Sequence, residues 1–395
     1  MLEKAAEVGG TWRDNSYPGA ACDIPSHLYS FSFAQNPNWS RTYPPQGEIQ
    51  DYLVDVATTL GVREHIRFNH EVLRAEWDEA TQHWTVVSNH GALRARVLVW
   101  ATGPLSESKL PNIPGLDSFA GHTVHTAAWG SGQDIAGKRV AVIGSGASAI
   151  QLVPSIAPEV GHLVVFQRTP NWIVPREDVA VPEWKKALYR AFTPALKLRR
   201  LRAYIRQEML APGLLGKKSK IYDALKKMTR DHLEAQVEEA ELRELLTPDY
   251  PVGCKRVLIS NDWYPARGVV DTDGVEHEVD VIVFATGFEA ATPSFAGHVT
   301  GRNGLLLSEA WRNGMEAYLG SSIPGFPNLF ALAGPNTILG HNSVVYMIEA
   351  QLNQVGGAIA FLHQNHLGSL EVTEQAEREW SEELEERFEG TVWTS

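Results

Sequence analysis

The sequence predicts an α/β fold built from parallel strands, glycine turns and helices, and three observations support this class. Residues 138–149 read as a strand, a tight glycine turn and the start of a helix. Two further apolar strands end in the same tripeptide, Ala-Thr-Gly, at 101–103 and 285–287. Residues 181–243 have a largely helical pattern. With 395 residues, the chain is long enough for two or three domains of roughly 150 residues each.

Hydrophobic periodicity predicts each element in turn. Apolar residues at helical spacing predict a helix over 46–60, and a second helix is expected over 344–361. The acidic segment 371–389 is expected to be a solvated surface helix. Alternation and short apolar runs predict strands over 66–68, 72–77, 83–88, 94–100, 140–143, 162–166, 279–284 and 326–334.

The glycine turn carries a nucleotide-binding pattern, G-x-G-x-x-A. In such a loop the first glycine makes the turn and the second lets a pyrophosphate approach the backbone, while the third small residue lets the helix pack on the strand. The helix N-terminus then offers free N–H groups to the phosphates. The same spacing also occurs in plain turns, but the helix to about 158 and the strand after it favour dinucleotide binding. The loop residues expected at the dinucleotide are Gly144, Ser145, Gly146, Ala147, Ser148 and Ala149.

The residues after the second strand of this unit indicate which dinucleotide binds. An acidic side chain there would bind the ribose 2′-hydroxyl of NAD, but the chain reads Gln167-Arg168-Thr169. A guanidinium suits a 2′-phosphate because it binds phosphate as a fork. We therefore expect NADPH rather than NADH, with Arg168 and Thr169 at the phosphate. The alternative is that Arg168 is an ordinary surface residue.

Composition limits the classes of function. Apolar residues make up 44% and charged residues 21% of the chain, and the net charge is −12, which argues against nucleic acid as a partner. No apolar run reaches the ~18 residues that span a membrane, and the first residues do not form a signal peptide. We therefore expect a cytoplasmic enzyme and no membrane partner. The two cysteines do not form a disulfide framework.

A family resemblance appears just before the glycine turn. Phe119, Gly121, His125 and Trp129 match the pattern F-x-G-x-x-x-H-x-x-x-W, which resembles the signature of the Baeyer–Villiger monooxygenases, within the class B flavoprotein monooxygenases of the flavin-containing monooxygenase superfamily. Gly130 departs from this pattern, because those enzymes usually have Pro or Asp there. The related N- and S-oxidising enzymes carry an aromatic residue other than Trp at the last position.

The resemblance implies an α/β flavoprotein with two dinucleotide-binding, Rossmann-like domains and a helical insertion. Residues 1–112 and 285–395 would form the FAD-binding domain, and 113–284 the NADP-binding domain with its insertion at 181–246. The two Ala-Thr-Gly strand ends resemble the places where the chain crosses between such domains.

The resemblance also implies roles for individual residues. Arg256 would be the catalytic arginine, and Asp23 would orient it by charge pairing. The arginine would stabilise a C4a-peroxyflavin anion and its adduct with the substrate. Without the resemblance, Asp23 reads as a turn residue before Pro25 and Lys255-Arg256 as a surface pair. The remaining residues expected at FAD or NADPH are Glu3, Gly10, Thr11, Trp12, Tyr29, Val72, Ala101, Thr102, Gly103, His125, Trp129, Lys255, Asn336 and Asn342.

Two parts of the family pattern are not found in the sequence. Met1 to Lys4 match the end of the second strand of an FAD-binding unit, so we expect the preceding strand, glycine loop and helix to be missing. A shorter internal deletion is expected after Ala266. Two interpretations of these departures stay open: a truncated gene model, or a fragment with impaired FAD binding.

The resemblance implies an NADPH- and O2-dependent monooxygenase that converts a ketone to an ester or lactone. Two alternatives stay open: an enzyme that oxygenates N or S, and a catalytically impaired fragment that binds NADPH alone. Residues 183–230 hold 14 Lys or Arg and 3 Asp or Glu. We favour the family's helical insertion for this basic stretch, where the charge would attract a polyanionic dinucleotide. The less favoured interpretation is a membrane-binding or partner-binding surface.

Overall fold

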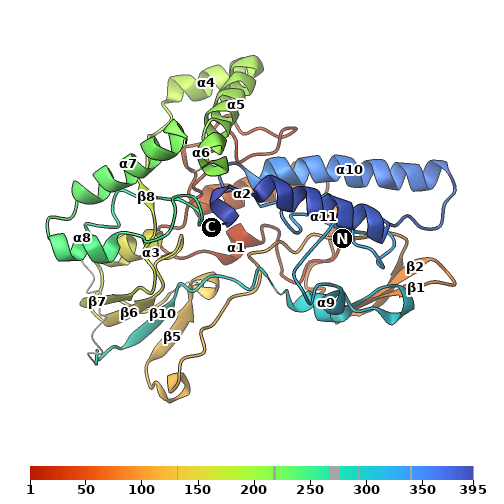
Figure 1. The fold of residues 1–395 in the computed structure, drawn as a ribbon, viewed down its shortest axis with the longest axis horizontal. Helices are drawn as coiled ribbons and strands as arrows, with labels where there is room; N and C mark the ends of the chain where they lie inside the picture. Colours follow the sequence, from red (N-terminus) through yellow and green to blue (C-terminus); the bar gives the residue numbers. More distant parts are fainter. Residues whose placement is uncertain (131, 217–218, 267–275, 292, 339, 395) are drawn as a thin grey trace.

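The strand before the glycine turn lies inside a four-stranded parallel sheet in the computed structural model (Figure 1). Helix α3 (Ala149–Ile156) follows this strand and packs on the sheet. Val140, Val142, Val281 and Val283 are fully buried, as expected for a parallel sheet covered on both faces. In spatial order the strands are β5 (His122–His125), β10 (Val281–Phe284), β6 (Arg139–Ile143) and β7 (His162–Phe166).

The structure describes residues 1–130, 132–216, 219–266, 276–291, 293–338 and 340–394. The internal deletion expected after Ala266 falls at 267–275, outside the described residues.

A four-stranded sheet and a two-stranded sheet form a second region, which lies on the other side of the view in Figure 1. Trp77, Trp84 and Phe326 pack together in its core. Its strands come from both ends of the sequence, which is consistent with a domain interrupted by the parallel sheet; the exact boundaries stay a prediction. The first sheet has the order β11 (Val299–Thr300), β1 (Val72–Asp78), β2 (His83–Ser88) and β3 (Gly91–Ala95), and the second pairs β12 (Leu329–Ala331) with β4 (Leu98–Trp100).

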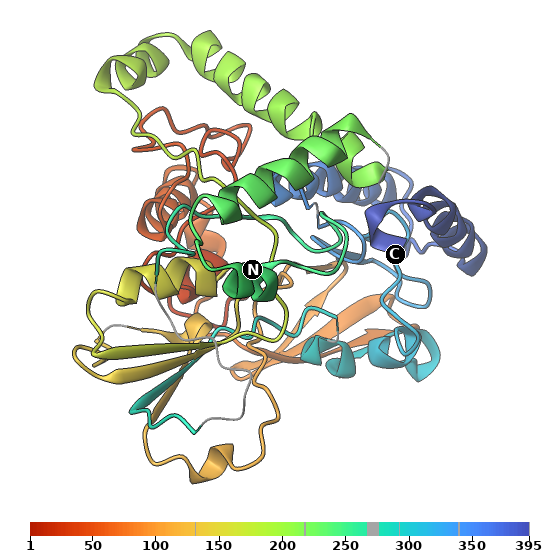
Figure 2. The same cartoon turned by 60° about the vertical axis from the view of Figure 1, so that its left-hand side comes forward.

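Helices cover these sheets and extend beyond them. Both views place α4 (Glu183–Ala191) and α5 (Thr193–Glu208) at the outer edge of the molecule (Figures 1 and 2). The two-stranded ladder of β8 (Ile173–Val174) and β9 (Leu258–Ile259) flanks them in sequence. The remaining α-helices are α1 (Thr11–Asp14), α2 (Gln46–Thr59), α6 (Ala211–Leu215), α7 (Lys220–Glu234), α8 (Ala240–Leu246), α9 (Leu307–Ala310), α10 (Val344–Gln364) and α11 (Glu374–Phe388).

Most predicted elements are present, and three strand predictions need correction. The strand predicted at 66–68 is wrong, because only Arg67 forms a bridge, to Leu2, and Asn69 then turns the chain with φ of 59°. The strand predicted at 94–100 is split, because β4 leaves the antiparallel sheet and pairs with β12. The strand predicted at 326–334 is shorter, because Asn328 and Ala333 adopt positive φ on either side of it.

Each described helix is either too short or too polar to be a membrane-spanning segment. Within the described ranges, no helix combines the length and the apolar character needed to cross a bilayer.

Candidate functional site

A two-pronged ion pair joins Asp23 to Arg256, although the two residues are 233 positions apart. Arg256 Nε donates to Asp23 Oδ2 at 2.8 Å, and a terminal guanidinium nitrogen donates to Oδ1 at 2.6 Å. The Arg256 side chain is 36% exposed and that of Asp23 is 24% exposed. Arg256 lies just before β9, and Asp23 lies in the loop before α2. The fold therefore brings together the two residues predicted to be catalytic.

The surroundings of Arg256 keep its guanidinium charged. Burial lowers the pKa of Arg256, but the charge of Asp23 and its hydrogen bonds, with Cys22 and Tyr29 nearby, outweigh that effect and raise the pKa overall. The carboxylate contacts one edge of the planar guanidinium through two hydrogen bonds. This bidentate pairing fixes both the orientation of the guanidinium plane and the position of its positive charge. The pair therefore presents an oriented cation that does not lose its proton.

Trp12 and Tyr29 form a second contact near this pair. Trp12 Nε1 donates to the Tyr29 hydroxyl at 2.9 Å, and the rings meet edge to face with centroids 5.6 Å apart. Burial raises the pKa of Tyr29, and the neighbouring Cys22 adds to the rise, so the phenol stays neutral. Thr11 and Trp12 begin the short helix α1, directly after Gly10 with φ of 50°.

The loop that carries Asp23 packs directly on α3. Gln151 of α3 accepts a hydrogen bond from the Tyr17 hydroxyl at 2.9 Å and donates to the Ala21 carbonyl at 3.0 Å. Gly19 is required at this contact, because a Cβ there would lie 2.5 Å from the Gln151 carbonyl oxygen. The Asp23 loop and the glycine turn are therefore held together through one helix.

The glycine turn has the geometry that its pattern predicts. Gly144 has φ of +114°, and a Cβ there would lie 2.4 Å from the Ala285 carbonyl oxygen. At Gly146 a Cβ would meet no atom within 4 Å. The Ser145 hydroxyl donates to the Thr169 carbonyl at 3.1 Å, and Asn171 Nδ2 donates to the Ser145 carbonyl at 2.7 Å. Asn171 was not predicted as a site residue, because no pattern links it to the turn.

The cations predicted at the NADPH phosphate are exposed. Arg168 lies two residues after the end of β7, and it has no ion-pair partner in the part of the chain that the structure describes. Lys255 is exposed as well, and its Nζ lies 4.5 Å from the centre of the Tyr250 ring. Ala147 and Ser148 lie just before α3. An exposed Arg168 beside the Ser145–Thr169 contact is consistent with a phosphate-binding role.

His125 and Trp129 of the family pattern are buried inside the protein. His125 ends β5, its Nδ1 accepts from the Ala127 backbone N–H at 3.0 Å, and its ring meets Phe288 edge to face. Burial lowers the pKa of His125, and a hydrogen bond with the Gly287 backbone offsets part of this decrease. Trp129 packs in the core around the parallel sheet with Ile135. These contacts show structural roles, and cofactor binding by the two residues stays a prediction.

The remaining predicted residues lie in four separate places. Glu3 is ion-paired with Arg13 at 3.1 Å, and Val72 begins β1. Ala101, Thr102 and Gly103 follow β4, and Gly103 and Asn336 line a cavity of about 150 Å³ beside Trp100. Asn342 is buried and donates a hydrogen bond to Glu208 at the end of α5. Among the described residues, neither Glu3 nor Asn342 makes a hydrogen bond or an ion pair with Asp23 or Arg256.

Arg200 of α5 is a buried residue that the sequence analysis did not identify. Its guanidinium donates to the carbonyls of Leu28, at 3.3 Å, and Ser30, and it lies 3.6 Å from a carboxylate oxygen of Glu349 on α10. Burial lowers the pKa of Arg200, against the opposing charge of Glu349. The signal in the sequence is the helical spacing of Arg200 with the buried Leu196 and Ala203. The insertion therefore holds the turn that contains Tyr29.

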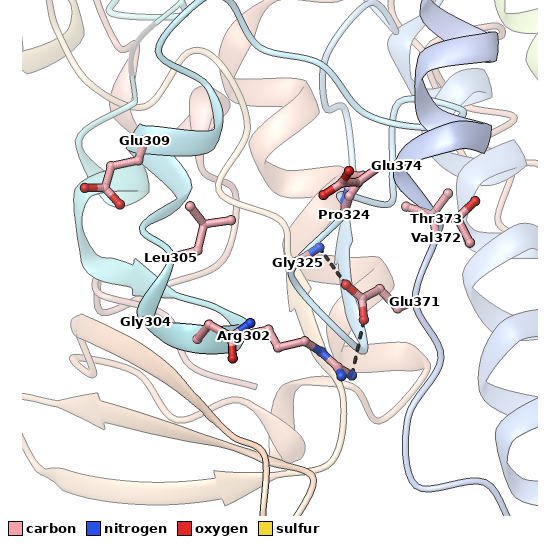
Figure 3. Close-up of a pocket in the computed structure, with 11 residues that line it drawn as sticks. Arg302, Gly304, Leu305, Glu309, Pro324, Gly325, Glu371, Val372, Thr373 and Glu374 are labelled. Atoms are coloured by element: carbon pink, nitrogen blue, oxygen red, sulfur yellow. Dashed lines mark hydrogen bonds and ion pairs between the residues drawn. The ribbon is translucent and has the colours of Figure 1, made fainter.

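A surface hollow of about 630 Å³ contains none of the predicted site residues (Figure 3). It is lined by one cation and three carboxylates: Arg302 lies 3.2 Å from Glu371, which also accepts from the Gly325 backbone N–H at 2.6 Å, and the other two carboxylates are Glu309 and Glu374. Within the described ranges, no group of three or more His, Cys, Asp or Glu side chains is arranged to hold a metal ion. The hollow therefore suggests no chemistry.

The described residues fit dinucleotide cofactors at two places. The open position at Gly146, before the N-terminus of α3, allows a pyrophosphate to approach the backbone. Gly10 and Gly103 have positive φ and also leave their Cβ positions open, so a second cofactor can approach the chain closely there. Gln151 of α3 links the first of these places to the loop that carries Asp23.

Comparison with known proteins agrees with this geometry. Residues 2–303 match the flavin-binding monooxygenase-like family. A Baeyer-Villiger monooxygenase of Streptomyces coelicolor is 45% identical, with 100% of this chain and 80% of the relative covered. The closed crystal structure of cyclohexanone monooxygenase has a TM-score of 0.87 at 33% identity, covering 100% of this chain and 85% of that one. The structure of OTEMO in complex with FAD and NADP has a TM-score of 0.88 at 30% identity, covering 99% and 86%.

Proposed function

The chain belongs to the flavin-binding monooxygenase-like family, and we propose that it inserts one oxygen atom of O2 beside the carbonyl of a ketone. In this reaction a ketone, O2, NADPH and a proton give an ester or lactone, water and NADP⁺. FAD, when bound, takes the hydride from NADPH and activates O2. Relatives named Baeyer-Villiger monooxygenase and neighbours solved with FAD and NADP support this assignment.

The observation that carries the proposal is the fork between Asp23 and Arg256. Addition to a ketone places negative charge on oxygen, and a cation that is already fixed in position stabilises that charge without reorganising. In our proposal Arg256 supplies this cation and Asp23 holds its orientation. Lys255 and Arg168 hold the NADPH phosphates, and the glycine turn receives the pyrophosphate. Trp12, Tyr29 and Gly103 line the approach to the flavin.

The direct test is a reaction with labelled oxygen. The purified chain is incubated with FAD, NADPH, ¹⁸O2 and cyclohexanone, the substrate that gives a structural neighbour its name. We expect a lactone that carries one ¹⁸O atom, with NADPH consumed in proportion. Sulfoxide formed from a sulfide, without lactone from any of a panel of ketones, would support the N- or S-oxygenating alternative. NADPH binding without any flavin absorbance would support the impaired fragment.

Replacing Arg168 tests the choice of dinucleotide. Charge-assisted hydrogen bonds to a 2′-phosphate contribute about 1.5–3 kcal/mol, so R168Q should raise the Kd of NADPH roughly 10- to 100-fold. The Kd of NADH, which lacks that phosphate, should stay unchanged, as measured by fluorescence titration. R378Q is the matched control, because Arg378 is exposed on α11. Equal losses for NADPH and NADH would contradict the assignment of Arg168.

A further inference from the structure

Helices α4 and α5 carry large apolar side chains that the protein leaves exposed. These are Trp184, Leu188, Phe192, Leu198, Leu201, Ile205 and Met209, which we call the outer stripe, and their exposed fractions lie between 42% and 65%. Single exposed apolar residues are common on proteins, but a group of this size on two adjoining helices marks an interaction site.

The geometry of α5 separates the outer stripe from the core. Leu196, Arg200 and Ala203 are buried and face the body of the protein. At 100° per residue, Leu201 and Ile205 fall on the opposite side of the helix. A surface helix normally places polar residues there. Helix α5 therefore has two apolar faces, and only the inner one is covered by the described residues.

Cations border the outer stripe. Lys197 and Arg202 lie on either side of it on α5, and neither has an ion-pair partner among the residues that the structure describes. Lys185 Nζ lies 5.4 Å from the Trp184 ring centre. Residues 183–208 contain eight Lys or Arg and two Asp or Glu, a difference of +6, in a chain of net charge −12. The border of the outer stripe is therefore locally positive.

The position of the two helices leaves the outer stripe accessible. Both views show α4 and α5 at the edge of the molecule, away from the parallel sheet (Figures 1 and 2). The outer face of a helix is convex. A deformable apolar medium can enclose such a face, whereas a rigid partner would need a groove to bind it.

We propose that the outer stripe docks the protein on an anionic lipid surface. The apolar side chains enter the boundary between headgroups and acyl chains, and Lys197, Arg202 and Lys185 meet the lipid phosphates. Tryptophan is the residue type most typical of that boundary. A second copy of the chain fits less well, because a two-fold pairing of this face would bring the same cations together. The exposure of the outer stripe thus favours membrane binding by the basic stretch, which the sequence analysis ranks below a helical insertion whose charge attracts a dinucleotide.

Vesicle sedimentation tests the proposal without any use of catalytic activity. We expect the protein to bind vesicles of phosphatidylcholine with 30% phosphatidylglycerol (a composition chosen for the assay), and to bind pure phosphatidylcholine vesicles at least ~10-fold more weakly. Raising NaCl from 0.1 M to 1 M shortens the Debye length from about 10 Å to about 3 Å and should release most of the bound protein. The K197Q/R202Q variant should show a weaker dependence on salt.

One pair of variants isolates the apolar contribution. I205E should lower the vesicle partition coefficient roughly 10-fold or more, because it places a charge in the lipid boundary. L73E is the matched control: Leu73 and Ile205 are both 48% exposed, but Leu73 lies on β1. Equal binding of I205E and the unmodified chain, or absence of binding to anionic vesicles, overturns the proposal. A dimer in light scattering that I205E dissociates, without vesicle binding, would assign the outer stripe to a second copy instead.

Discussion

Arg256→Ala should lower the rate of ester or lactone formation roughly 100- to 1,000-fold, the loss typical when one oxyanion-stabilising group is removed. The substitution removes the cation of the fork and leaves the Asp23 carboxylate, which is 24% exposed, without its partner. Negative charge that develops on oxygen then meets a net anionic site. The measurement is product formed per NADPH consumed, under saturating NADPH and ketone.

The control for Arg256 is R74A, which breaks a surface ion pair with Glu76, where Arg74 is 56% exposed. Such pairs contribute about 0–1 kcal/mol, so R74A should keep both stability and activity. Sulfide oxidation gives a second readout, because that reaction does not need a stabilised anionic adduct. The R256A variant should therefore retain a larger fraction of its sulfide-oxidation rate than of its ketone-oxidation rate. Unchanged ketone turnover in R256A would remove Arg256 from the catalytic assignment.

Two alanine substitutions in the glycine turn should separate folding from NADPH binding. G144A forces a Cβ to within 2.4 Å of the Ala285 carbonyl oxygen at φ of +114°, so the free energy of unfolding should fall by on the order of 3 kcal/mol. G146A meets no protein atom within 4 Å, so stability should change by less than about 0.5 kcal/mol. Its methyl group occupies the approach of the pyrophosphate, so the Kd of NADPH should rise at least ~10-fold.

Denaturant unfolding and NADPH titration measured on both variants check this separation. The two variants serve as controls for each other, because they add the same methyl group two residues apart. If G146A bound NADPH as tightly as the unmodified chain, the turn would be a structural feature without a pyrophosphate. If G144A were as stable as G146A, the close approach of the turn to Ala285 would not constrain the fold.

The sequence predicts local units well, and the reasons are physical. The turn at Gly144 follows from glycine spacing and a continuous apolar strand, both of which are local properties. Asp23 and Arg256 could be paired in advance only through the family resemblance, because no local rule links residues 233 positions apart. The split of the strand predicted at 94–100 depends on its partner β12, which comes from the other end of the chain.

Contacts made by single side chains across the fold were the hardest to predict. The structure shows the Asn342 amide bound to Glu208, a contact that no sequence pattern indicated, and cofactor binding by Asn342 stays a prediction. Arg200 reads as one of many cations in a basic stretch, yet it is buried against backbone carbonyls. In both cases the partner lies more than 100 positions away, so neither charge nor periodicity identifies it.

The Arg200 contacts also limit how this protein can be redesigned. A designer who wished to shorten the helical insertion could remove parts of α4 with little consequence inside the protein, because α4 has no buried residue. A cut through α5 would leave the carbonyls of Leu28 and Ser30 without the donor that Arg200 supplies and the Glu349 carboxylate without its cation, and unpaired buried polar groups are costly. Within the insertion, α4 can therefore be replaced, whereas α5 is part of the packed protein. Chimaeras with other members of the family should place the junction at the boundary between α4 and α5.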